Sequence, residues 1–222
     1  MLKPLSGNLG LMTLFVVFLA LLSCSESQPP FASPIPESQG DSKVTNIGRS
    51  SWQKPHLVIQ KLGDVSQKTI ADIGAGTGYF TFRMAFKAKK IIATDIDTNM
   101  IAIINEFAVN LPPEIQTKIE TRLVQPNDPM IRKGECDIAV LINTLAYIDH
   151  QQAYLTKLHS AMLPGDTLMV VDFKSSSISG IAQHYKIIEA GKVLEILKAA
   201  GFTDAEVDTQ TLEYQYIITA RA

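Results

Sequence analysis

Three glycines at alternate positions follow an apolar stretch that ends in an aspartate. Residues 69–79 read TIADIGAGTGY, so that Gly74, Gly76 and Gly78 come shortly after Asp72. Glycine is favoured where the backbone takes a positive φ or passes close to a ligand, and the N–H groups at the start of a helix attract anionic groups. The segment therefore predicts a strand, a turn and a helix start that hold a small molecule against the main chain.

The spacing of the glycines narrows the kind of small molecule. A dinucleotide-binding turn requires G-x-G-x-x-G, whereas the third glycine here is Gly78 and Tyr79 stands where the last glycine is needed. A phosphate-binding P-loop requires Gly-Lys followed by Ser or Thr, and this sequence does not follow the turn. NAD is therefore disfavoured, and nucleotide binding by a P-loop is excluded.

A second polar residue ends the next apolar segment. Asp95 closes the segment 91–95 and lies about 20 residues beyond the glycines, where an acidic side chain accepts hydrogen bonds from ribose hydroxyls in nucleotide-binding α/β folds. Ile96 and Met100 come next and could flank an adenine ring. Asp97 is the weaker ribose candidate, and we expect it to cap a helix that starts near Thr98.

The sequence DIGAGTGYF resembles motif I of class I S-adenosylmethionine (SAM) dependent methyltransferases. In that family the glycine loop underlies the amino-acid end of SAM. The resemblance therefore implies SAM as cofactor, held by residues at the end of the first strand and in the loop: Asp72, Gly74, Ala75, Gly76, Gly78 and Tyr79. The alternative is a glycine-rich turn between a strand and a helix in some other α/β protein.

Many methyltransferases place an aspartate after the third strand, where it binds the exocyclic amine of adenine. By resemblance, Asp128 takes this role, and Asn127 is a second candidate. The segment QPNDP at 125–129 is also ordinary turn chemistry, so both interpretations stay open.

The segment 136–143, CDIAVLIN, has the acid-then-apolar form of the fourth strand in this family. Strand ends in open α/β sheets face the ligand crevice, so we expect Asn143 to contact the cofactor and the methyl acceptor. Tyr147 is expected to form a polar or cation–π wall for the sulfonium and the acceptor. His150 is a further catalytic candidate, and Asp172 and His184 are weaker candidates for a general base.

The acceptor segment also departs from known patterns. The sequence NTLAY at 143–147 differs from the N-P-P-Y of amino-group methylases that act on DNA adenine or protein glutamine, which counts against those substrates. Bacterial relatives that share the W-Q-K-P of residues 52–55 often carry paired histidines where this chain has Ala146 and Tyr147. We expect a methyltransferase for a small-molecule or lipid-associated acceptor. A SAM-binding protein that has lost turnover is the alternative.

The resemblance implies an α/β, Rossmann-like, doubly wound sheet of seven strands, mostly parallel with an antiparallel C-terminal hairpin, in an α/β/α sandwich. The sequence places later strands at 91–95, 119–124, 136–143, 167–173, 205–208 and 214–220. We expect helices to start at Pro55 and Tyr79, to cover 150–162 with Asp149 as cap, and to end at Gly201. The polar run 175–180 could cover the acceptor site, with His184 and Tyr185 on its far side.

The first residues read as a targeting segment. Residues 9–22 form an apolar run, shorter than the roughly 20 residues that span a bilayer, which is typical of a signal peptide. The sequence LLSC at 21–24 resembles the bacterial lipobox, in which the cysteine is lipidated. We expect a lipoprotein-type signal peptide over 1–23, with Cys24 as lipid attachment site, or an uncleaved anchor. Either one tethers the protein to a membrane.

Residues 24–50 are rich in Ser, Pro and Gln and predict a disordered linker, which leaves one methyltransferase domain over 51–222. The net charge of −2 and the pI of about 6.1 lack the basic footprint of nucleic-acid-binding domains, so no nucleic acid is expected as a partner. The chain has no C-x-x-C pair and no His/Cys cluster, and no metal is expected. The sequence does not predict an oligomeric state.

Overall fold

A computed structural model of the protein describes residues 48–175 and 185–222, which all lie in one compact unit. The expected signal peptide, Cys24, nearly all of the expected linker, and His184 lie outside the described residues. Within the two described ranges, no helix is both long enough and apolar enough to cross a membrane.

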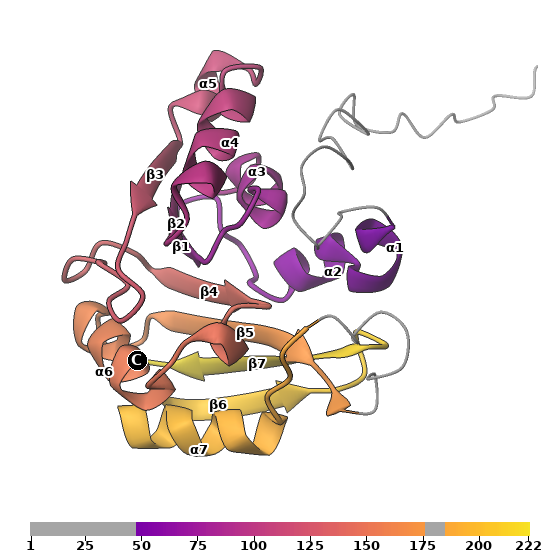
Figure 1. Cartoon of the computed structure of the whole chain (residues 1–222), viewed down its shortest axis with the longest axis vertical. Helices are drawn as coiled ribbons and strands as arrows, with labels where there is room; N and C mark the ends of the chain where they lie inside the picture. Colours follow the sequence, from indigo (N-terminus) through magenta and orange to yellow (C-terminus); the bar gives the residue numbers. More distant parts are fainter. Residues whose placement is uncertain (1–47, 176–184) are drawn as a thin grey trace, which may run out of the picture. The chain divides into compact units, whose positions relative to one another are not determined.

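Seven strands of the described chain form one sheet (Figure 1). Their order across the sheet is β3-β2-β1-β4-β5-β7-β6. The first five pair in parallel, and β7 is antiparallel to both β5 and β6. The strands are β1 (Thr69–Ile73), β2 (Lys90–Asp95), β3 (Ile119–Leu123), β4 (Ile138–Ile142), β5 (Thr167–Phe173), β6 (Thr203–Asp208) and β7 (Gln215–Arg221). This order confirms the predicted Rossmann-like sheet with its antiparallel C-terminal hairpin.

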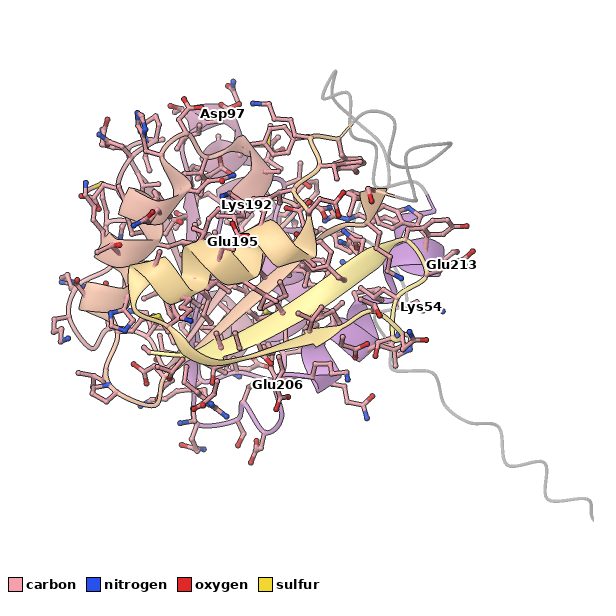
Figure 2. All side chains as sticks on the ribbon, turned by 90° about the horizontal axis from the view of Figure 1, so that it is seen from below. Lys54, Asp97, Lys192, Glu195, Glu206 and Glu213 are labelled. Carbon is pink, nitrogen blue, oxygen red and sulfur yellow. The ribbon has the colours of Figure 1, made fainter. Side chains whose placement is uncertain are left out.

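Burial along the strands follows their place in the sheet. All residues of β4 are buried, because helices cover both faces of the central parallel strands. The edge strand β6 is mostly exposed and carries charged residues such as Glu206, which Figure 2 shows at the molecular surface. Charges on an edge strand oppose pairing with another chain.

Helices cover both faces of the sheet (Figure 1). One apolar core includes side chains of α2, α3, α4 and α5, and a second core includes side chains of α6 and α7. The helices are α1 (Arg49–Gln53), α2 (Pro55–Gln60), α3 (Tyr79–Ala85), α4 (Thr98–Ala108), α5 (Pro113–Gln116), α6 (Gln151–Ala161) and α7 (Ala190–Ala200), with a 3-10 turn η1 at Leu145–Tyr147. The result is the predicted α/β/α sandwich.

Several helices start or end at the residues that the sequence predicts. Pro55 occupies the first turn of α2, Asp97 accepts a hydrogen bond from the Asn99 N–H at 2.8 Å, and α7 ends at Gly201 with φ of 105°. The predicted cap of α6 is wrong. His150, not Asp149, precedes α6, and it holds a left-handed φ of 33° without a side-chain cap.

Candidate active site

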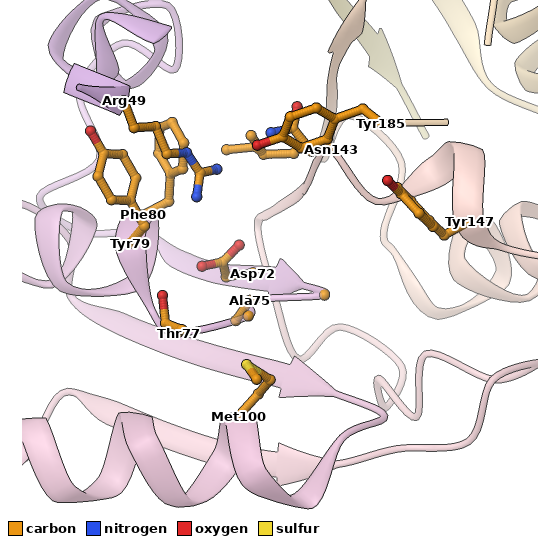
Figure 3. Close-up of a pocket in the computed structure, with 13 residues that line it drawn as sticks. Arg49, Asp72, Ala75, Thr77, Tyr79, Phe80, Met100, Asn143, Tyr147 and Tyr185 are labelled. Carbon is orange, nitrogen blue, oxygen red and sulfur yellow. The ribbon is translucent and has the colours of Figure 1, made fainter. Parts of the chain in front are cut away.

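A pocket of about 240 Å³ lies at the carboxyl ends of β1 and β4 (Figure 3). The glycine loop, residues 74–78, borders one side of it, and the segment from Ile142 to Tyr147 borders another. Parallel α/β sheets bind ligands at this end of their strands. The lining residues are Arg49, Asp72, Gly74, Ala75, Gly76, Thr77, Tyr79, Phe80, Met100, Ile142, Asn143, Tyr147 and Tyr185.

The backbone of the glycine loop has the conformation that the sequence predicts. Gly74, Gly76 and Gly78 have φ values of 70°, 55° and 81°. A Cβ on Gly74 would lie 2.4 Å from Thr144 Cγ2, whereas a Cβ on Gly76 would meet no described atom within 4 Å. Gly74 therefore allows two loops to pack closely, and Gly76 keeps space open at the pocket. Gly78 precedes α3, where a Cβ would lie 2.7 Å from Phe82, and it is not among the lining residues.

Asp95 holds the glycine loop in place. Its Oδ2 accepts a hydrogen bond from the Gly76 N–H at 2.8 Å, and its Oδ1 accepts one from the Asp97 N–H at 3.0 Å. The side chain is largely buried at the end of β2. Each carboxylate oxygen can accept a second hydrogen bond, so the predicted contact with ribose hydroxyls stays compatible with these bonds.

Asp72 is a buried acid at the wall of the pocket. It accepts a hydrogen bond from Thr81 Oγ1 at 2.6 Å. Burial raises its pKa to about 6, although the Thr81 hydroxyl and the positive charge of Arg49 both oppose that rise. At neutral pH the carboxylate is therefore mostly ionised and presents a negative charge to a cationic ligand.

Arg49 is a lining residue that sequence reasoning missed, because the domain was expected to begin at residue 51. Its guanidinium lies 4.3 Å from the centre of the Tyr79 ring, and burial lowers its pKa from the ordinary value. Figure 3 shows the guanidinium above Asp72 in the pocket. Arg49 lies three residues before Trp52, which is helical spacing, and this spacing was the signal in the sequence that could have placed Arg49 in the domain.

The candidate acceptor side is formed by Asn143, Tyr147 and Tyr185. Asn143 directly follows β4 with φ of 57°, and its Oδ1 accepts a hydrogen bond from Gln215 Nε2. The Tyr147 hydroxyl accepts one from the Lys186 N–H at 3.1 Å. The Tyr185 ring packs against Phe173 with centroids 4.4 Å apart. The pocket thus joins the two segments that the sequence assigned to cofactor and acceptor.

Several predicted site residues lie outside this pocket. Asp128 folds onto its own turn, with Oδ1 accepting from the Met130 N–H at 2.8 Å and Oδ2 lying 3.4 Å from Lys157 Nζ. Asn127 and His150 line a separate cavity of about 500 Å³. Ile96 is 60% exposed. The roles predicted for these residues stay predictions. A ligand in the main pocket could contact them only if it extended beyond that pocket.

The main pocket suits the amino-acid end of SAM. Asp72 offers an anion to the ammonium group, Gly76 leaves room beside the backbone, and the Tyr147 ring can face a sulfonium. No group of three or more His, Cys, Asp or Glu residues within the described ranges could hold a metal ion.

The strand order, the glycine loop and the pocket at the strand ends define a class I, Rossmann-like methyltransferase domain. The sequence profile of the family described as "Methyltransferase domain" matches residues 50–207, so the chain belongs to this family. Solved structures that share this fold include a SAM-dependent methyltransferase and a methyltransferase in complex with SAM, which supports SAM as the cofactor.

Individual relatives are distant. Magnesium-protoporphyrin O-methyltransferase of Rhodobacter capsulatus is 30% identical over 114 residues, which are 48% of each chain, so this chain spans about half the length of that relative. The crystal structure of a SAM-dependent methyltransferase from Aquifex aeolicus aligns with a TM-score of 0.70 at 18% identity, over 78% of this chain and 92% of that one. Phosphoethanolamine N-methyltransferase 2 of Haemonchus contortus, solved with SAM, aligns with a TM-score of 0.61 at 14% identity, over 77% and 52%.

Proposed function

We propose that this chain transfers the methyl group of SAM to a small-molecule acceptor that enters beside Asn143, Tyr147 and Tyr185. The observation that carries this proposal is that one pocket is lined by both the glycine loop and these three side chains. A donor and an acceptor that bind in the same pocket are held close together, and orientation of this kind contributes up to roughly 7–11 kcal/mol to catalysis.

Different residues of the pocket bind the cofactor and the acceptor. SAM supplies an activated methyl group on a sulfonium, so the protein mainly has to bind and align the two reactants. Asp72 and the backbone around Gly76 hold the cofactor, and Asp95 keeps the loop in shape through its bond to the Gly76 N–H. Tyr147 and Asn143 position the acceptor. The buried rings of Tyr79 and Phe80 exclude water from one wall of the pocket.

The names of two relatives support a small acceptor. The Rhodobacter capsulatus protein is named for magnesium-protoporphyrin, and the Haemonchus contortus protein for phosphoethanolamine. Both acceptors are small molecules, one with O-methylation and one with N-methylation in its name. A lipid-associated acceptor stays part of the proposal, because it accords with the proposed attachment of the chain to a membrane through Cys24.

Labelled SAM tests the proposal. Purified protein is incubated with methyl-labelled SAM and the small-molecule and lipid fractions of a cell extract, and the label is followed by chromatography. We expect transfer of label to a component of one of these fractions, with loss of transfer when Asp95 is changed to alanine. Tight binding of SAM without transfer of label would instead favour a SAM-binding protein without turnover.

A further inference from the structure

A row of four polar side chains, the middle two of them fully buried, connects α1 to the end of β4. Arg49 Nε donates a hydrogen bond to Gln53 Oε1, and Gln53 Nε2 donates to Gln215 Oε1 at 2.9 Å. Gln215 Nε2 then donates to Asn143 Oδ1. Gln53 and Gln215 are both fully buried, so water cannot replace these bonds, and each broken bond would leave a buried polar group without a partner. We call these four residues the amide relay.

The first member fixes the direction of the whole amide relay. A guanidinium has only donors, whereas a side-chain amide has an oxygen that accepts and a nitrogen that donates. Gln53 must therefore turn its oxygen to Arg49 and its nitrogen to Gln215. Gln215 must do the same toward Asn143, so one arginine determines the orientation of three amides.

The relay leaves the amide nitrogen of Asn143 as a donor for a ligand. Its Oδ1 is bound to Gln215, and its amide nitrogen Nδ2 has no hydrogen-bond partner among the residues that the structure describes. Asn143 lines the pocket, and its left-handed φ of 57° is one that asparagine tolerates better than most residues. The side chain therefore offers an N–H donor to the pocket from a fixed backbone position.

The surroundings of Asn143 also favour a ligand that carries a negative charge. The Arg49 guanidinium brings a positive charge into the same pocket, and Figure 3 shows Arg49, Asn143 and Tyr185 around its upper part. The acid of the pocket, Asp72, lies at the end of β1 beside the glycine loop, where the proposed function assigns it to the cofactor. The Tyr147 and Tyr185 side chains provide ring surfaces for an apolar body.

We propose that the amide relay selects a methyl acceptor with an ionised oxygen, namely the carboxylate of an aromatic or other apolar acid, and disfavours an amine. This inference deepens the proposed function and rests on it. A carboxylate accepts hydrogen bonds from Asn143 Nδ2 and is attracted by Arg49. A protonated amine is repelled by Arg49, and it would have to share the Asn143 oxygen with Gln215 Nε2.

The reaction balances without a proton transfer. A carboxylate oxygen forms the new bond to the methyl carbon while the bond between that carbon and the SAM sulfur breaks. The electron pair of the broken bond goes to the sulfur, which becomes the neutral thioether of S-adenosylhomocysteine, and the acceptor becomes a methyl ester. Since a carboxylate is already ionised at neutral pH, the acceptor side needs no general base.

Binding of two simple probes tests the proposal. Calorimetry first measures S-adenosylhomocysteine, and then benzoate and benzylamine in its presence, with wild type and with Asn143→Asp. Aspartate keeps the size of the side chain, the tolerance for positive φ and an oxygen for Gln215, but it replaces the N–H donor with an acceptor. Asn110→Asp is the matched control, because Asn110 is exposed beyond α4 and outside the pocket.

We expect wild type and Asn110→Asp to bind benzoate at least about tenfold more tightly than benzylamine, which equals about 1.4 kcal/mol. In Asn143→Asp the preference should reverse. Changes in the ¹⁵N-labelled side-chain amide signal of Asn143 on addition of benzoate give a second readout that does not depend on turnover. Gln215→Glu, which can no longer donate to Asn143 Oδ1 when ionised, should also weaken the preference for benzoate.

Three results would overturn the proposal: equal or tighter binding of benzylamine by wild type, an unchanged ratio in Asn143→Asp, or binding of neither probe by a protein that binds S-adenosylhomocysteine. A protein that does not bind S-adenosylhomocysteine would instead contradict the proposed function itself, so the two failures are distinguishable.

Discussion

At the scale of single residues, Asp172 is a buried acid whose charged form is disfavoured by burial. It lies at the end of β5, is 1% exposed, and accepts a hydrogen bond from the Phe173 N–H at 2.9 Å through Oδ1. Oδ2 has no hydrogen-bond partner in the described part of the chain. Burial raises the pKa of this carboxyl to about 7.

The raised pKa of Asp172 predicts a pH-dependent stability. Its pKa is about 7 in the folded protein, against an ordinary 3.8. The folded state therefore binds the proton more tightly, and stability that is complete below pH 4 is lost as pH rises through 7. Asp172→Asn removes this pH-dependent loss. As pH rises from about 4 to 7, the free energy of unfolding of the variant should therefore increase relative to that of wild type, by up to about 1.4 kcal/mol per pH unit.

Urea unfolding of wild type and Asp172→Asn at pH 5 and pH 8 checks this prediction. Asp72, whose pKa is also raised, contributes equally to both proteins and cancels from the comparison. Parallel stability curves of the two proteins across this range would show that Asp172 is not a buried, destabilised acid.

Residues in the main pocket differ in how far the sequence could predict them. The alternating glycines and Asp72 could be predicted from the sequence, because a turn with positive φ at three positions requires a recognisable local pattern of glycines. Tyr185 was expected near the acceptor site, and it lines the pocket with its ring packed against Phe173. Arg49 was not predicted, because it lies in a segment whose composition resembles a linker and it reaches the pocket through tertiary packing.

At the scale of elements, an ion-pair cluster ties β3 to the segment that leads into β4. Glu135 accepts hydrogen bonds from Arg122 Nη1 and Nη2 at 3.0 and 2.9 Å and from the Arg132 N–H at 2.9 Å. The Glu135 side chain is only 10% exposed. These bonds to the two arginines hold the pKa of Glu135 well below its usual range.

Glu135→Gln should lower the free energy of unfolding by about 2–3 kcal/mol at pH 7, because Arg122 then lacks its bidentate partner in a largely buried position. A depressed pKa gives stability that is present above the ordinary value of 4.5 and lost as pH falls, so the difference should shrink toward pH 3. Chemical denaturation at both pH values measures this difference.

Glu195→Gln on α7 is the control for that experiment. Glu195 pairs with Lys192 at 3.0 Å, but the two side chains are 70% and 60% exposed on the outer side of the helix (Figure 2). Exposed pairs contribute little, so this variant should stay within about 0.5 kcal/mol of wild type. Equal losses in both variants would contradict a special role of Glu135.

The strands were easier to predict than the helix ends. Buried parallel strands are continuous apolar runs, which is why 167–173 was predicted with the bounds that β5 has. The start of α6 depends on backbone geometry at His150, whose left-handed φ has no marker in the sequence. The same holds for α1, which begins at Arg49, inside the expected linker.

At the scale of the whole molecule, the proposed membrane attachment gives a prediction of its own. We expect the native mature protein to begin at Cys24 and to carry acyl chains, because 21–24 resembles a lipobox. Mass spectrometry of the N-terminal peptide from membranes of the native host, compared with a Cys24→Ser variant, measures this mass. An unmodified peptide that contains residues upstream of Cys24 would contradict cleavage and lipidation.

The sheet order and the pocket together support the central claim that SAM binds beside the glycine loop. Gly76 provides the sharpest variant, because its Cβ position is open and lies at the pocket. Gly63 is its matched control, since it also has a positive φ, 74° against 55°, and open space around its Cβ, but it is outside the pocket. Alanine at either position carries a similar backbone cost of about 1–2 kcal/mol.

Isothermal titration of SAM into wild type, Gly76→Ala and Gly63→Ala is the most direct test of this claim. We predict one SAM bound per chain by wild type and by Gly63→Ala with similar affinity, and at least about tenfold weaker binding by Gly76→Ala. Absence of SAM binding by wild type, or equal affinity in Gly76→Ala, would contradict the account.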